Sequence, residues 1–520
     1  MHKWPSNEEI IRGVDNSKSI ADYARQLGYP RRTVSTKYHN ALRQVDERLT
    51  KSNFFISCAQ INTPAHEGFL KNVKAMCESK GAAILISGFT YNKDGMGHDK
   101  MGNADNKDKE YLYDPSLNPY MTFDRVSLNK KLEFMGSLNI LPTATHPLSG
   151  LQTHTDTQSA IIPHPKITLE SVPTLPGKLA KLLMTTGCMT YPNYMQKKAG
   201  QKAEKWHTIG GLWVEIVNDK HFHVRQIMAE EDGSFYDLTD RWEDGKLSTG
   251  HRVESIAWGD THYPDVDNNV AGACWFSTES MLNILKPKDQ FFHDLLDFKC
   301  RNHHNRDDAF FIQSKANERV RAEIEGCAHL LINTSREWCK SHVVASNHDN
   351  AYERWVREVS ASEEPNMDNA IFLLQSKLAM YESYKTDKKI NMFEWASAPY
   401  LRRFDHRIHF MHVDESFRSA NGIEYGMHGD KGPNGARGSV KSFARIGTPS
   451  FIGHGHQATI FENCWMTGIT RTQDAGYNKG PSSWSHTQGI EYSNGKRCLV
   501  TIIDGQWCKN IPEEASVRIS

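Results

Sequence analysis

The sequence lacks paired-cysteine motifs. Its 520 residues include 10 cysteines, but no two of them form a Cys-x-x-Cys pair, which argues against a zinc ribbon and against a disulfide-framed secreted fold. We expect these cysteines to be reduced and mostly buried. The chain also has no apolar run long enough to cross a bilayer, and its first residues do not have the pattern of a signal peptide. These absences predict a cytoplasmic protein.

Neither sign of charge is in excess. Lys and Arg number 62, Asp and Glu also number 62, and the formal net charge is zero. Contact with a nucleic acid would therefore depend on local basic patches rather than on a global field. Histidine is abundant, with 25 residues, and this abundance directs the search towards metal ligands.

Residues 19–42 have the pattern of two short helices. Apolar residues at helical spacing stand on both sides of a break that begins at Gly28. This is the helix-turn-helix pattern, and we assign residues 1–52 to such a module. The side chains expected to contact DNA from the second helix are Arg31, Arg32 and Lys37. A small helical cap or an oligomerisation hairpin is the alternative.

Residues 53–250 begin like a β-α-β unit. Residues 54–62 and 82–89 are strand-like, and the segment between them has helical spacing. An α/β domain is therefore expected here. Residues 92–120 are polar, rich in glycine and without periodicity, which predicts a long loop or flap.

In residues 251–520, side chains of the kinds that bind metals follow strand-like runs. Asp260 and His262 stand two residues apart in an extended segment, so both point to the same side and can reach one point past the strand end. Oxygen and imidazole ligands together suit a divalent transition metal. The further residues of this kind are Asp294, Asp297, Asn347, His348, Asp349, His428, His454 and His456. If each follows a strand, they meet at one edge of a sheet, where α/β enzymes place their sites.

In this order the motifs Asp-x-His, Asp-x-x-Asp, Asn-His-Asp, His and Gly-His-x-His resemble those of the calcineurin-like metallophosphoesterase superfamily. The resemblance covers residues 251–520 and implies a catalytic domain built as a two-layer β-sandwich flanked by helices, with two metal ions at the strand ends. It implies that one metal is held by Asp260, His262 and His456, the other by Asn347, His428 and His454, and that Asp294 bridges them. The chain departs from the family at His293, where a glycine usually precedes the bridging aspartate.

The resemblance also places His348 beside the leaving group, oriented by Asp349. Phosphodiester hydrolysis needs a hydroxide nucleophile and compensation of charge on the phosphoryl oxygens, and two cations about 3.5–4 Å apart supply both. Mixed Asp, Asn and His ligands favour Mn, Fe or Zn over Mg, and we expect Mn. His348 would give a proton or a hydrogen bond to the departing oxygen. His412 is an alternative to His428, although its alternating segment also fits a strand with one solvated face.

The same plan fits residues 53–230, with almost every ligand missing. Gln60 and Asn62 would occupy the first motif, and Phe89 and Asn92 the second. We interpret this region as a degenerate phosphoesterase-like domain that cannot hold two metals and serves binding or assembly instead. An unrelated α/β domain is the alternative, because a β-α-β start is common.

The metal motifs do not distinguish among the phosphatases, nucleotidases, cyclic phosphodiesterases and DNA nucleases of the superfamily. The helix-turn-helix pattern and the basic run Arg437, Lys441 and Arg445 favour a polyanionic polymer. The prediction is a DNA nuclease similar in mechanism to the SbcD-type nucleases. The arrangement also resembles phage-encoded phosphoesterases, including the pre-early type that degrades host DNA in the host cytoplasm.

Two other functions stay open. One is a phosphoprotein or nucleotide phosphatase, and the other is a DNA-binding regulator whose phosphoesterase domain is a non-catalytic scaffold. The expected partner is DNA and no membrane is expected, while self-association into a homo-oligomer is left open.

Overall fold

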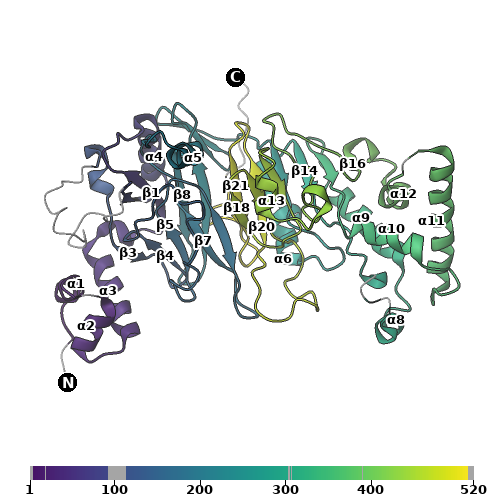
Figure 1. The fold of residues 1–520 in the computed structure, drawn as a ribbon, viewed down its shortest axis with the longest axis horizontal. Helices are drawn as coiled ribbons and strands as arrows, with labels where there is room; N and C mark the ends of the chain where they lie inside the picture. Colours follow the sequence, from purple (N-terminus) through teal and green to yellow (C-terminus); the bar gives the residue numbers. More distant parts are fainter. Residues whose placement is uncertain are drawn as a thin grey trace. The chain divides into compact units, whose positions relative to one another are not determined.

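The computed structural model describes residues 4–17, 19–91, 113–302, 305, 307–388 and 390–512. It contains two compact units, each made of several segments of the chain. Figure 1 shows the helices and strands, coloured along the sequence. Unit 1 comprises Met1–Ile167, Leu183–Phe235 and Trp242–Leu247, and unit 2 comprises Thr168–Leu182, Tyr236–Arg241 and Ser248–Ser520. Among the described residues, none of the helices combines the length and the apolar character needed to span a membrane.

Unit 1 begins with three helices, α1 (Asn7–Asp15), α2 (Ile20–Leu27) and α3 (Arg31–Val45). A capping box of Ser6 and Glu9 starts α1, and Gly28, in the left-handed conformation at φ 69°, ends α2. Helices thus occupy the positions that the apolar spacing predicted. Their use as a DNA-reading helix-turn-helix stays a prediction.

A four-stranded sheet of order β2-β1-β8-β9 follows. Strands β1 (Asn53–Gln60) and β2 (Ala83–Phe89) are parallel and are joined by helix α4 (Glu67–Ser79), so the predicted β-α-β unit is confirmed. The predicted loop at 92–120 lies largely outside the described residues. The other elements of unit 1 are η1 (Glu47–Thr50), η3 (Pro115–Tyr120), β3 (Arg125–Ser127), β4 (Leu132–Met135), β5 (Ser159–Ile162), α5 (Lys198–Trp206), β8 (Gly210–Ile216) and β9 (Phe222–Met228).

Four short strands contain points at which the chain passes from one unit to the other. They are β7 (Lys181–Thr185), β10 (Phe235–Asp237), β11 (Asp240–Glu243) and β12 (Lys246–Ser248).

Unit 2 is built on a six-stranded sheet of order β16-β15-β14-β13-β20-β21. The first four strands in this order run parallel to their neighbours, and the last two form an antiparallel hairpin beside β13. The hairpin turns at Gly495, whose φ of 76° is in the left-handed region that glycine adopts readily. The strands are β13 (Ser255–Ala257), β14 (Asp289–Phe292), β15 (Lys340–Val343), β16 (Ile408–Phe410), β20 (Thr487–Glu491) and β21 (Arg497–Thr501).

A second set of strands in unit 2 has the order β17-β19-β18-β6. They are β17 (Ser450–Ile452), β19 (Cys464–Met466), β18 (Thr459–Phe461) and β6 (Leu169–Val172). The helices of unit 2 are α6 (Asn268–Ala271), η4 (Gly272–Phe276), α7 (Met281–Leu285), η5 (Lys299–Arg301), α8 (Ala309–Ser314), α9 (Val320–Thr334), α10 (Asp349–Glu358), α11 (Met367–Thr386), α12 (Met392–Leu401), η7 (Asp405–Arg407), η8 (Pro433–Gly435) and α13 (Val440–Ala444). The mixed α/β class is confirmed, whereas the metallophosphoesterase sandwich stays a prediction.

Both units contain the same four-strand arrangement. In unit 1, β1 is parallel to β2 and antiparallel to β8, which is antiparallel to β9. In unit 2, β13, β14, β20 and β21 repeat these directions. This agreement is what a degenerate copy would produce, although the common origin of the two domains stays a prediction.

The structure confirms the predicted state of the cysteines. All ten are free and buried, as the absence of paired motifs predicted. Most of them lie among aliphatic and aromatic side chains of the two cores, for example Cys274 and Cys327 in unit 2 and Cys77 in unit 1.

Candidate metal centre

The predicted metal ligands of unit 2 gather where its parallel strands end. Asp260 follows β13, Asp294 follows β14 and Asn347 follows β15. Because these three strands are parallel neighbours, their carboxyl ends lie at one edge of the sheet. The turn after β17 adds His454 and His456 to this edge.

Four side chains form the first group. Asp260, His262, Asp294 and His456 each offer a ligand atom within 4.8 Å of the others. Nε2 of His262 lies 3.1 Å from Nε2 of His456 and 3.6 Å from Oδ2 of Asp294, and Nε2 of His456 lies 3.1 Å from Oδ2 of Asp260. The structure therefore brings together the three ligands expected for one metal and the aspartate expected to bridge.

Asp294 also belongs to a second group, with His428 and His454. Its Oδ2 lies 3.2 Å from Nε2 of His428, and Nδ1 of His454 lies 3.1 Å from Oδ1 of Asn347. The alternative His412 is exposed and its backbone N–H bonds to Glu415, whereas His428 is buried in the cluster. Asp294 is thus the one carboxylate that the two described groups share.

His348 stands beside the first group. Its ring centroid is 4.6 Å from that of His262, and its Nδ1 lies 3.0 Å from the carbonyl oxygen and 3.2 Å from Oδ1 of Asp297. Oδ1 of Asp297 also lies 2.9 Å from Nδ1 of His262. Among the described residues no hydrogen bond joins His348 to Asp349, so the orienting contact is made by Asp297 instead of the expected Asp349.

Exposure divides the cluster into a floor and a rim. Asp260 and His262 are fully buried and Asp294 is 1% exposed, while His348 and His454 are partly exposed. A molecule that approaches from solvent would therefore meet the rim histidines before the carboxylates. This arrangement is suitable for a site in which the buried carboxylates bind a cation and the partly exposed histidines contact the substrate.

Burial and neighbouring charges act on the pKa values in opposite directions. Burial by itself raises the pKa of Asp294, but the charges of His428 and His348 outweigh it and hold that pKa well below its ordinary range. Burial lowers the pKa of His428, yet the charge of Asp294 raises it to about 9. Burial also lowers the pKa of His348, and the charges of Asp294 and Asp297 raise it to about 10. The Asp294 carboxylate and the imidazoles of His428 and His348 thus each favour the charged form of the other.

The buried polar atoms at the centre fit a cation. Both carboxylate oxygens of Asp260 and of Asp294, and Nε2 of His428, make no hydrogen bond of good geometry in the described part of the chain, and the contacts of these carboxylates with His428 and His456 are ion pairs only when the imidazoles are protonated. Leaving such atoms unpaired in a buried place is unfavourable unless something else satisfies them. Nε2 of His262 and Nε2 of His456, 3.1 Å apart, can hydrogen-bond to each other when one of them carries a proton, and both can instead bind a cation when neither does. Carboxylate, amide and imidazole donors together fit a divalent transition metal.

The backbone of the ligand loops is strained in a way that aims the side chains. His262, Asp294, His454 and His456 all have positive φ, between 43° and 68°, a left-handed conformation that non-glycine residues seldom adopt. Such strain gathers at functional sites, where the surrounding structure enforces it. Gly453 makes room for the cluster, because a Cβ there would lie 2.2 Å from Oδ1 of Asp260.

Three residues near the cluster were not singled out as site residues by the sequence patterns. Arg471, 1% exposed, places its guanidinium 2.9 Å from Asp265 and 3.7 Å from Asp297. His293 lies 3.4 Å from His428, nitrogen to nitrogen, and the Trp484 ring packs against His456 at 4.4 Å between centroids. The sequence had named His293 only as a departure from the family pattern, whereas Asp297 was predicted as the second carboxylate of Asp-x-x-Asp.

The predicted DNA-contacting residues belong to unit 1. Arg31, Arg32 and Lys37 are exposed on α3, and the Lys37 ammonium lies over the Trp4 ring at 5.6 Å from its centroid. His303 and His304 lie outside the described residues.

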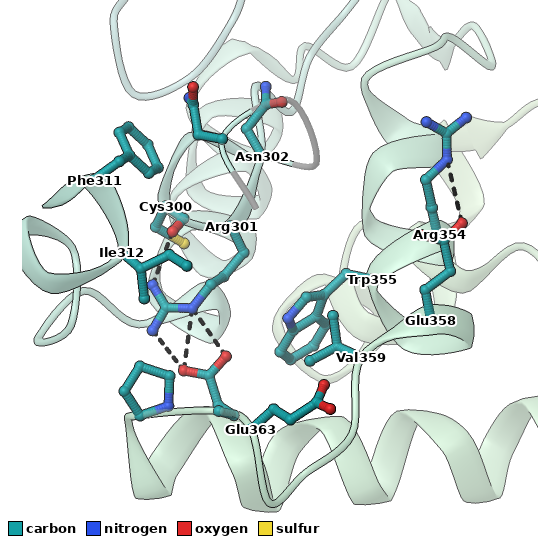
Figure 2. A pocket seen from close by; sticks show the side chains of 13 residues that line it. Cys300, Arg301, Asn302, Phe311, Ile312, Arg354, Trp355, Glu358, Val359 and Glu363 are labelled. Carbon is teal, nitrogen blue, oxygen red and sulfur yellow. Dashed lines mark hydrogen bonds and ion pairs between the residues drawn. The ribbon is translucent and has the colours of Figure 1, made fainter. Parts of the chain in front are cut away.

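A cavity of about 150 Å³ lies beside the segment that follows Asp297 (Figure 2). Arg301 and Glu364 meet at its wall in a two-pronged ion pair of 2.9 and 2.5 Å, and Trp355 and Ile312 add apolar surface. The buried charges of this wall neutralise each other. The cavity therefore has fewer groups available to bind a cation or a phosphate than the histidine and aspartate cluster has. The candidate catalytic site is therefore the cluster.

Comparison with known proteins identifies one relative. No protein-family model and no solved structure matches the chain, so the resemblance to metallophosphoesterases rests on the motifs. Protein A1 of Escherichia phage T5 is 36% identical over 469 residues, which cover 87% of this chain and 82% of the relative. This similarity supports a phage origin. The chain belongs to the family of protein A1 of phage T5.

Proposed function

We propose that the chain is a two-metal phosphodiesterase of the calcineurin-like type that hydrolyses DNA. The observation that carries this proposal is Asp294, which lies in two ligand groups at once. A carboxylate shared in this way can hold two cations side by side, the arrangement that in-line phosphoryl chemistry uses. When bound, two such cations, with Mn preferred, would activate water and offset charge on the phosphoryl oxygens.

The residues of the chain then have distinct tasks. Asp260, His262 and His456 would hold one cation, and Asn347, His428 and His454 the other. Because Nδ1 of His348 bonds to Asp297, the other ring nitrogen is left to give a proton to the departing oxygen. Asp297 would position His348 and His262 together.

DNA is the proposed substrate because basic side chains are exposed in both units. Arg437, Lys441 and Arg445 are exposed around α13, in the chain segment that follows His428, and the exposed cations of α3 add to them in unit 1. Contacts of this kind bind a phosphate backbone irrespective of its sequence. The phage origin of the relative is compatible with a role in which DNA is degraded during infection.

The decisive experiment compares substrates and one pair of variants. Purified full-length chain is incubated with plasmid DNA, nucleoside monophosphates and an aryl phosphate, each with and without Mn²⁺. Asp294→Asn should lose DNA cleavage and bound metal without unfolding, while Asp387→Asn, an exposed aspartate at the end of α11, should behave as wild type. Intact DNA with rapid monophosphate hydrolysis would point to a phosphatase, and full turnover by Asp294→Asn at saturating Mn²⁺ would refute the bridging role.

A further inference from the structure

Helix α11 of unit 2 is apolar on two faces. Its inner face is part of the core, where Phe372 and Leu373 are buried and the Ser376 hydroxyl hydrogen-bonds with that of Tyr352 at 2.8 Å. It packs against α9, α10 and α12, and Figure 1 shows α10 and α12 on one side of it. A surface helix with a single buried face would carry polar side chains on its other face.

The outer face instead carries a stripe of large apolar side chains. Met367 is 74% exposed, Ile371 48%, Leu374 57%, Leu378 62% and Tyr381 62%. Their separations along the chain are four, three, four and three residues, which is the heptad spacing of a coiled-coil seam. We call these five residues the α11 stripe.

We propose that the α11 stripe is an interface with a second copy of this chain, formed as a short parallel two-stranded coiled coil. In the heptad frame, Ile371 and Leu378 take the a positions, and Met367, Leu374 and Tyr381 take the d positions. A β-branched residue at a with leucine at d favours two parallel strands, which is the combination that Ile371 and Leu374 provide. A helix with this spacing pairs with a second helix that has the same heptad pattern, and α11 of a second copy of the chain provides one.

The flanking charges select the parallel direction. Lys377 occupies a g position and Glu382 the e position five residues later, so in a parallel pair Lys377 faces the partner subunit's Glu382, twice by symmetry. In an antiparallel pair, g faces g and e faces e, which would set Lys377 against its own counterpart. Opposite charges are thus matched in one direction only.

The size of the stripe is adequate for a stable contact. Five large side chains from half to three quarters exposed correspond to roughly 500–700 Å² per copy, somewhat below the ~800 Å² per partner of a standard interface. A free 20-residue helix would have to fold before it could pair, but α11 is already held by the core of unit 2. Pairing therefore does not carry the cost of ordering a helix.

The first test is the mass of the full-length chain in solution. By sedimentation at micromolar concentration we expect twice the chain mass of 59.2 kDa. Leu374→Glu with Leu378→Glu should give the single mass with an unchanged melting temperature, and Leu175→Glu, at a residue 68% exposed elsewhere in unit 2, should leave the double mass. A wild-type monomer at all concentrations, or a double mutant that stays dimeric, would overturn the proposal.

The second test fixes the direction of pairing without adding charge. All ten native cysteines are buried, so Leu378→Cys introduces an exposed thiol. In the parallel pair, residue 378 meets its own counterpart, and mild oxidation should link Leu378→Cys to itself. Linkage only after mixing Leu378→Cys with Leu374→Cys would mean an antiparallel pair and would refute the charge argument. Lys377→Glu should weaken the dimer, and adding Glu382→Lys should restore it.

Discussion

Replacing His348 by asparagine separates proton donation from metal binding. The imidazole is held through Nδ1 by Asp297 and lies beside His262; it is outside the two groups that contain Asp294 and forms a third group with His262 and Asp297. Loss of a general acid slows a reaction with a poor leaving group by roughly 10²–10⁴-fold. We expect DNA cleavage to fall by that factor, and hydrolysis of an activated aryl phosphodiester to fall by less than about tenfold, since its leaving oxygen needs little protonation.

The assay measures turnover of both substrates at saturating Mn²⁺, together with the metal content of the purified variant. His412→Asn is the matched control, because this histidine is exposed and outside the cluster. Equal slowing of the two substrates with metal retained would refute the acid role and favour a role in positioning the phosphate. Loss of metal would instead make His348 a ligand. A lower melting temperature with an unchanged ratio of the two rates would mean that His348 only braces the loop after β15.

Three further predictions concern the metal, a glycine and a buried acid. Chelation by EDTA should abolish hydrolysis but leave part of the DNA binding in a gel-shift assay; equal loss of both would mean that the metal mainly holds the structure. Gly453→Ala should weaken metal binding and lower the free energy of unfolding by about 1–3 kcal/mol, because the new methyl group would displace Asp260. Gly272→Ala is the control, since its methyl group meets no atom within 4 Å and should leave metal binding unchanged. An unchanged metal titration curve for Gly453→Ala would contradict the prediction. Burial raises the pKa of Glu323 to about 7 from its ordinary 4.5, so the protonated form is favoured in the folded state and the free energy of unfolding should fall as pH rises from about 4.5 to 7. This fall is worth roughly 3 kcal/mol, and Glu323→Gln, followed by urea unfolding at pH 4.5 and pH 8, should remove it; an identical pH dependence in the variant would refute the assignment.

Local patterns were sufficient to predict the elements that position the site. The break at Gly28, the β-α-β start at β1 and the strands before Asp260 and Asp294 all follow from short-range spacing and turn residues. The motif order also indicated which side chains would meet, because parallel strands place their carboxyl ends at one edge. Whether they bind two metals and cleave DNA is a separate question that the experiments above address.

Contacts made across the fold could not be read from spacing. His348 and Asp349 are neighbours in the chain, but they start α10, and consecutive residues of a helix do not face each other. Asp297, 51 residues earlier, makes the contact instead. Arg471 reaches the cluster from the loop after β19, and no local pattern distinguishes it from other arginines. Such partners become visible only when tertiary packing is known.

Because both units contain the same four-strand arrangement, the residue at a strand end in unit 1 can be compared with the residue at the same place in unit 2. The comparison indicates how much stability the charged cluster costs. In unit 1, Leu85 pairs with Ile56 of β1, and Phe89 follows Leu85 by four residues. In unit 2, Gln290 pairs with Ile256 of β13, and Asp294 follows Gln290 by four residues. Phe89 packs against Cys58 and Cys188, a contact that burial favours, whereas Asp294 loses hydration at the equivalent place. On the predicted correspondence of the two units, the same framework forms in unit 1 with an apolar residue at this place, and we infer that unit 2 does not need its charged cluster in order to fold. We therefore expect a protein that keeps its shape when metal is scarce and regains activity on resupply without refolding.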